Sequence, residues 1–164
     1  MSAVVTIKFK KIDGDSSVGA APKKSFDVLS WNWGMSQSAS AHVSKGASQG
    51  SADVRDLTFT KLADKASPTI AADCFNGVDE QEVTLSMWKT ANGKTYEYVR
   101  IAMTGIVFIS SYHTGDIGPN DQLLETITMN FANVQVSFTP PKDNGDPDST
   151  VEGKLLKIAE KANG

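Results

Sequence analysis

Residues 26–37 read FDVLSWNWGMSQ, and the order of apolar and polar residues in this stretch decides the fold class. The side chains alternate with a period of two, which is the pattern of a β-strand with one apolar face. On this pattern, one face holds Leu29, Trp31 and Trp33, and the opposite face holds Val28, Ser30 and Asn32. Two tryptophans on one face predict a heavily buried sheet, because each indole ring removes a large apolar area from water.

The same alternation recurs along the chain, and turn signals separate the segments. Three further strands are expected around residues 5–9, 57–59 and 83–87. The dipeptide Asn92-Gly93 lies between two apolar runs and predicts a tight β-hairpin.

Two long segments follow this hairpin. Residues 95–109 are apolar on both faces, with Ile106 and Phe108 among them, and this predicts a strand that is buried on both sides. In residues 122–138 the apolar positions shift from odd to even numbers near Ala132, which predicts a β-bulge or a strong bend. Bends of this kind allow long strands to curl a sheet into a barrel.

One short helix is expected at residues 67–76. Ser67 is suited to the N-cap, Pro68 to the first helical position, and Asn76-Gly77 to the C-terminal stop. The apolar residues of this segment fall on one face at helical spacing, and they are Ile70, Ala71, Cys74 and Phe75. Many strands and one short helix predict a mainly β fold, an antiparallel barrel or sandwich of two sheets with the helix at its side.

Blocks of sequence in a fixed order along the chain resemble the haemolysin-coregulated protein (Hcp) family of bacterial type VI secretion systems. They are residues 26–37, DLTFTK at 56–61, DKASP at 64–68, and NFANVQV at 130–136 followed by Pro140. The resemblance covers most of the chain. It implies two sheets closed into a barrel, with a helix packed on the side.

The length of 164 residues fits one domain over residues 1–164, with a core at 3–139 and a tail at 140–164. Local rules favour a helix in the tail, because residues 149–152 form a capping box and apolar residues follow at helical spacing. Members of the Hcp family instead tend to end in an extended segment added to the sheet. Because Gly153 is also unfavourable inside a helix, we expect the extended form.

The composition excludes several classes of protein. The chain carries 16 Lys and Arg against 19 Asp and Glu, a formal net charge of −3, which predicts no binding to nucleic acid. Cys74 is the only cysteine, so no intramolecular disulfide can form. The N-terminus lacks the pattern of a Sec signal, and the most apolar stretch, 99–109, is shorter than the ~20 residues of a membrane span. We expect a chain that folds in the cytoplasm, does not insert into membranes, and is secreted by a dedicated machine without a cleavable signal peptide.

The candidate catalytic and metal-binding residues form no recognised motif. His42 and His113 lie in small, polar stretches. A triad assembled from Ser110, His113 and Asp116 has no nucleophile elbow to support it. Residues 143–148 suggest a calcium loop, but their glycine is at the third position instead of the sixth. We predict no enzyme activity, no cofactor and no metal.

Two surfaces carry the predicted function. Residues 35–50 are rich in Ser, Ala and Gly, which by itself indicates a flexible hairpin tip, whereas the resemblance implies a loop that packs against a neighbouring subunit. The predicted protomer contacts are Gln37, His42, Lys45 and Gln49. Ser30 and Asn32 point away from the tryptophans, and the resemblance implies that this outer face lines the lumen of a ring. Ordinary solvated strand positions are the alternative for these two residues.

The resemblance implies a structural protein of the type VI secretion apparatus. Hexameric rings would stack into a tube, and a contractile sheath would expel the tube with a spike protein at its tip. The lumen would carry and protect effector proteins. A monomeric β-sandwich that binds carbohydrate through exposed Trp88, Tyr96 or Tyr112 is the alternative, and a hydrolase that uses His113 is a further one.

Overall fold

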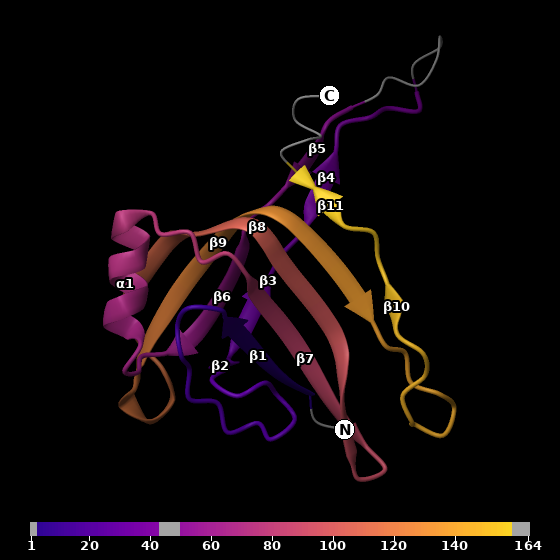
Figure 1. The fold of residues 1–164 in the computed structure, drawn as a ribbon, viewed down its shortest axis with the longest axis horizontal. Coiled ribbons are helices and arrows are strands. Elements are labelled where there is room, and N and C mark those ends of the chain that lie inside the picture. Colours follow the sequence, from indigo (N-terminus) through magenta and orange to yellow (C-terminus); the bar gives the residue numbers. More distant parts are fainter. Residues whose placement is uncertain (1–2, 43–49, 159–164) are drawn as a thin grey trace.

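The computed structural model describes residues 3–42 and 50–158, and strands dominate its regular structure (Figure 1). The elements are β1 (Ala3–Phe9), β2 (Phe26–Val28), β3 (Ser30–Asn32), β4 (Met35–Gln37), β5 (Ala52–Val54), β6 (Leu57–Leu62), α1 (Ser67–Asn76), β7 (Val83–Ala91), β8 (Lys94–Ile117), the 3-10 helix η1 (Pro119–Asp121), β9 (Leu123–Phe138), β10 (Val151–Glu152) and β11 (Leu156–Lys157).

The strands form one large antiparallel sheet and one small one. The large sheet has the order β2-β1-β7-β8-β9-β6-β3, and β10 and β11 add to it by pairing with β9. β4 and β5 form the separate two-stranded sheet. The large sheet curls into a nearly closed barrel with α1 at one side, which confirms the predicted fold class (Figure 1).

The predicted hairpin joins β7 and β8. Asn92 and Gly93 have φ angles of 52° and 74°, and two successive positive φ values are the geometry of the type I′ turn that suits a tight hairpin. The other predicted strands are also present, since β1, β6 and β7 cover residues 5–9, 57–59 and 83–87.

β8 and β9 are the longest strands, with 24 and 16 residues, and they pair with each other along most of their length. Their register slips between Thr104 and Val107, opposite the segment from Asn133 to Phe131. The buried positions of β9 change phase at the same point, from Phe131 to Val134. The irregularity predicted near Ala132 is therefore confirmed, but the extra residue belongs to β8, where Gly105 and Ile106 oppose Ala132 of β9.

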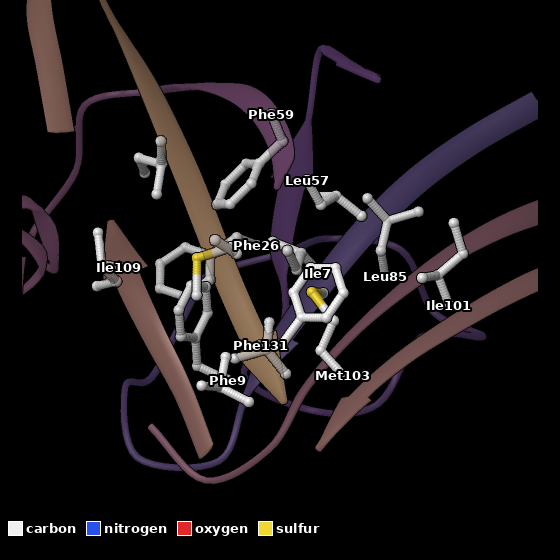
Figure 2. Packing of buried hydrophobic residues seen from close by; sticks show 14 of the residues in the cluster. Ile7, Phe9, Phe26, Leu57, Phe59, Leu85, Ile101, Met103, Ile109 and Phe131 are labelled. Atoms are coloured by element: carbon white, nitrogen blue, oxygen red, sulfur yellow. The ribbon is translucent and has the colours of Figure 1, made fainter. Parts of the chain in front are cut away.

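Apolar side chains from the strands fill the interior of the barrel (Figure 2). The Phe9 ring packs edge-on against Phe26, with 5.8 Å between the ring centroids, and lies 6.3 Å from Phe59. The helix contributes Ile70, which is fully buried. These contacts fix one face of every long strand, so the opposite face is left for solvent or for partners.

The decisive stretch contains a break that the alternation did not predict. β2 ends at Val28 and β3 begins at Ser30, and the two strands pair with different neighbours, β1 and β6. Val28 is 8% exposed and Leu29 is 50% exposed, so the prediction for these two residues was wrong. Because the chain changes its pairing partner at Leu29, the apolar phase slips by one residue there. Trp31 and Trp33 pack against the core, half-buried rather than fully buried.

Two further apolar residues that we expected to be buried lie on the outer surface. Ile106 is 51% exposed, because it is out of phase with the buried residues of β8, which are Ile101, Met103, Val107 and Ile109. Phe75 is 90% exposed. With Ile70 directed into the barrel, a residue five positions later is rotated by roughly 140° around the helix axis, which points it away from the core.

The bounds predicted for α1 are confirmed, but its N-cap is Ala66 and not Ser67. The Ser67 hydroxyl instead accepts a hydrogen bond from the backbone N–H of Asp64 at 2.9 Å, because Ser67 already has helical geometry. The helix ends at Gly77, as predicted. Within residues 3–42 and 50–158, no helix has the length and apolar character needed to cross a membrane.

The tail adopts the extended form that we expected. Val151 and Glu152 pair with the end of β9, and Leu156 and Lys157 pair with Val134 and Asn133 of the same strand. Both short strands lie along one edge of β9, where they protect its backbone groups from solvent.

Candidate functional site

The outer face of the β3-β6-β9-β8 part of the sheet carries short polar side chains. Residues that are paired across antiparallel strands lie on the same face, so the register aligns these side chains in rows. One row is Ser30, Thr60, Thr126 and His113, and the next is Asn32, Thr58, Thr128 and Ser111. We call these two rows the polar face. Hydroxyl pairs join neighbouring strands at Ser30–Thr60 (2.6 Å) and at Thr58–Thr128 (3.2 Å).

Ser30 and Asn32 are both exposed on the polar face, which is the orientation that the alternation predicted. The side chains between the rows point the other way, and Phe59 and Ile127 are buried in the core. The polar face is therefore the outer side of a sheet whose inner side is apolar. The structure brings Ser30 and Asn32 together with hydroxyl groups of three other strands.

Asp56 fixes one end of the polar face. Its Oδ1 accepts a hydrogen bond from Asn130 Nδ2 at 2.9 Å, and its Oδ2 accepts one from Ser110 Oγ at 2.8 Å. The Ser110 hydroxyl also lies 3.2 Å from the Thr128 carbonyl oxygen. Ser110 is the nucleophile of the triad considered above. Its hydroxyl instead makes hydrogen bonds that link β8 to β9 and to Asp56, which precedes β6.

β4 and β5 form an arm that extends from the barrel (Figure 1). Ser38 and Ser51 continue the pairing beyond the strands, since the Ser51 backbone N–H donates to Ser38 Oγ at 3.0 Å. A Cβ atom at Gly50 would lie 2.1 Å from the backbone nitrogen of Ala39. The two sides of the arm approach closely at this point, and only glycine allows that approach.

Two of the four predicted contact residues can be placed on this arm. Gln37 and His42 are exposed, and Gln37 Oε1 accepts a hydrogen bond from the Ala39 backbone N–H at 3.1 Å. Lys45 and Gln49 lie outside the described residues. A contact between protomers at these residues remains a prediction.

Sequence reasoning missed a buried ion pair behind the polar face. Lys61 and Glu125 are 1% and 0% exposed, and Lys61 Nζ lies 3.0 Å from Glu125 Oε1. Lys61 Nζ also lies 3.2 Å from Asp64 Oδ2, and the Ser67 hydroxyl donates to Glu125. The pKa of Tyr112 is raised to about 12, mainly because its phenol group is partly buried and also because the Glu125 carboxyl lies beside it. This cluster ties the start of α1 to β6, β8 and β9.

The sequence contained a signal for this pair. Lys61 is in phase with the buried Leu57 and Phe59, and Glu125 is in phase with Ile127 and Met129. Charged residues on the apolar phase of two strands indicate a buried pair, because an unpaired charge in the core is strongly unfavourable.

The aromatic residues that a carbohydrate-binding module would use are not available on the surface. Trp88 and Tyr96 are 8% and 9% exposed, and Tyr112 is half-buried. Trp88 Nε1 donates a hydrogen bond to Thr6 Oγ1 at 2.9 Å, within the protein itself. Among the described residues, no group of three or more His, Cys, Asp or Glu side chains is arranged to hold a metal ion.

Comparison with known proteins identifies the family. Residues 6–138 match the family model described as "Type VI secretion system effector, Hcp". Protein hcp1 of Pseudomonas aeruginosa strain PAO1 is 36% identical over 148 residues, which cover 90% of this chain and 90% of that protein.

Solved structures agree with this match. A type six secretion system protein superposes with a TM-score of 0.87 at 25% identity, and 98% of each chain is covered. Hcp1 from Salmonella typhimurium shares the fold, with a TM-score of 0.75 at 22% identity over 98% of each chain. From the family match along most of its length and from its barrel, this chain belongs to the Hcp family of type VI secretion systems.

Proposed function

We propose that this chain is a structural, non-catalytic subunit of the tube of a type VI secretion system. Copies of the chain associate into hexameric rings, and the rings stack into a tube. A contractile sheath expels the tube with a spike protein at its tip, and effector proteins travel in the lumen. The tube assembles in the cytoplasm and leaves through the apparatus itself. Family membership supports this proposal, and the observation that carries it is the polar face on a curved sheet.

The chemistry of the polar face suits a lumen wall. Hydroxyl and amide groups offer hydrogen bonds, each with a net value of about 0.5–1.5 kcal/mol, without strong apolar adhesion. Where two hydroxyls already hydrogen-bond to each other, as at Ser30–Thr60, they keep this hydrogen bond when a passing protein leaves. The departure of the protein therefore costs little free energy. We place Ser30 and Asn32 among the residues that contact the cargo.

The mass of the purified chain in solution tests the assembly. We expect particles of six subunits, each of 17.5 kDa, in light scattering, and rings in electron micrographs of the same fraction. A compact monomer over a wide range of concentration would contradict the proposal that this chain forms rings by itself.

The Asn32→Glu variant tests the lumen role. We expect intact rings that retain co-expressed cargo at least tenfold less, because a ring of added carboxylates replaces neutral hydrogen-bonding groups. The matched control is Gln122→Glu, which adds the same charge at an exposed turn outside the polar face. Equal cargo retention by wild-type and Asn32→Glu rings would exclude a contact at this position.

A further inference from the structure

The loop of residues 77–82, which joins α1 to β7, holds a carboxyl group inside the protein. Glu80 is fully buried, and neither oxygen of its carboxyl group has a hydrogen-bond partner among the described residues. Its backbone is fixed, because its N–H donates to the Val107 carbonyl of β8 at 2.8 Å. The Glu82 N–H donates to the Glu80 carbonyl at 2.7 Å across Gln81, whose φ is 66°, which is a γ-turn of the rare, strained kind. The loop therefore forces this side chain into a place where nothing solvates its charge.

Three charged groups face Glu80. The Asp73 carboxyl comes from α1, the Asp79 carboxyl from the same loop, and the Lys11 ammonium group from the segment after β1. The Asp79 carboxylate accepts hydrogen bonds from two backbone N–H groups, at 3.0 and 2.8 Å, and Lys11 Nζ donates to the Asp79 carbonyl at 2.8 Å. Two carboxyl groups against one ammonium group make a negative charge on Glu80 unfavourable. Mainly because of burial and then because of Asp73, the pKa of Glu80 is raised to about 8.

The last turn of α1 has few apolar contacts that could compensate for such a charge. Ile70 is the buried residue of the helix, and it lies in the first half. In the second half, Cys74 is half-buried against the core and Phe75 is 90% exposed. The Asp73 carbonyl accepts a hydrogen bond from the Val78 N–H at 3.1 Å, which links this turn to the loop. The last turn and the loop therefore form a weakly anchored unit, the kind of segment that opens locally.

We propose that Glu80 is a proton-dependent latch, which holds the last turn of α1 and residues 77–82 against β8 while its carboxyl group is protonated and releases them when the group ionises. The ionised carboxylate is repelled by Asp73 and regains hydration only by moving into water. The loop then leaves Val107, while the barrel stays paired, because residues 77–82 belong to no strand.

The direction of the pH dependence follows from the two states. The pKa of Glu80 is about 8 in the latched state, whereas a hydrated carboxyl group in the released state has the ordinary value of 4.5. The latched state therefore binds more protons between these values, and rising pH favours release. Each unit of pH in this range multiplies the ratio of released to latched chains by about ten, and the ratio levels off above about pH 8.

Backbone amide hydrogen exchange of the full-length chain, followed by NMR from pH 5 to pH 9, tests the latch. Each rate is divided into the rate of an unstructured peptide at the same pH, so that the pH dependence of the exchange chemistry cancels. We expect this protection factor to fall by more than about tenfold between pH 6 and pH 8 at Cys74, Val78 and Glu80, and then to level off. The Glu80→Gln variant should lose this fall, and the exposed control Glu82→Gln should keep it.

Urea at concentrations below the unfolding transition separates local release from unfolding of the whole chain. Local release exposes little surface, so exchange at Val78 and Glu80 should be nearly independent of urea, whereas exchange at the core residues Leu85 and Ile101 should speed up. An equal dependence on urea at all four amides would overturn the proposal.

The pH dependence can overturn the proposal as well. If the protection factors of the wild type and Glu80→Gln follow the same course with pH, Glu80 is not the group that controls release. Asp73→Asn decides the question if Glu80→Gln does not fold. Without the Asp73 carboxyl the pKa of Glu80 is raised less, so the protection factors should level off at a lower pH, and an unchanged course would contradict the latch.

Discussion

Glu80 and Glu125 are fully buried carboxyl groups with different neighbours. Glu125 faces Lys61 at 3.0 Å, so an opposite charge compensates for its burial. The carboxyl oxygens of Glu80 have no hydrogen-bond partner among the described residues. The pKa of Glu80 is raised to about 8, mainly by burial and then by the neighbouring Asp73 carboxyl. The positive charge of Lys11 lowers the pKa, but by less than these two effects raise it. Glu80 is therefore mostly protonated at pH 7.

Glu80→Gln tests this charge state. The pKa of Glu80 is 4.5 when unperturbed and about 8 in the folded chain, so the folded state binds more protons between these values. By linkage, the free energy of unfolding of the wild type falls as pH rises from about 4.5 to 8. A glutamine cannot ionise, so the variant should lack this fall and be more stable by about 2 kcal/mol or more at pH 8.

Urea unfolding followed by circular dichroism from pH 5 to pH 9 measures the difference at a fixed protein concentration. Glu82→Gln is the control, because Glu82 is exposed two residues away. Parallel pH profiles for Glu80→Gln and the wild type would show that Glu80 is ionised in the folded chain.

At the scale of elements, local patterns predicted which segments are strands but not where each strand changes partner. The alternation from Phe26 to Trp33 has the correct period, yet the chain moves from pairing with β1 to pairing with β6 at Leu29. A break of that kind depends on the arrangement of the whole sheet. The irregularity near Ala132 could be predicted, because the apolar phase of β9 shifts there within a single segment, but its extra residue on β8 could not.

In the tail, hydrogen bonds to a distant strand outweigh the local sequence signals. Its capping box and apolar spacing favour a helix, but the backbone N–H of Gly153 donates to the Val136 carbonyl at 2.8 Å, and Gln135 Nε2 donates to the Gly153 carbonyl at 2.9 Å. These hydrogen bonds to β9 require the extended form.

At the scale of the whole molecule, the arm is a two-stranded sheet of its own, and Val54 of this sheet packs against the core of the barrel. β4 and β5 pair only with each other, whereas the strands of the barrel form their own continuous sheet (Figure 1). Met35, Ala52 and Val54 of the arm line a pocket together with Leu155, Leu156 and Ile158 of the tail. Gln37 and His42 are exposed on this arm, where we predict a contact with a neighbouring protomer.

Replacement of residues 38–51 by a short Gly-Ser linker tests whether the arm joins the protomers. We expect a folded monomer, because none of the strand pairs of the barrel involves the replaced residues. Circular dichroism measures the retained β-structure, and light scattering measures the mass. A matched control replaces the loop residues 17–21 with a Gly-Ser sequence of equal length and should keep the ring. If the chain without residues 38–51 still forms intact rings, then the protomers associate through the barrel alone, and Gln37, His42, Lys45 and Gln49 are not the residues that join them.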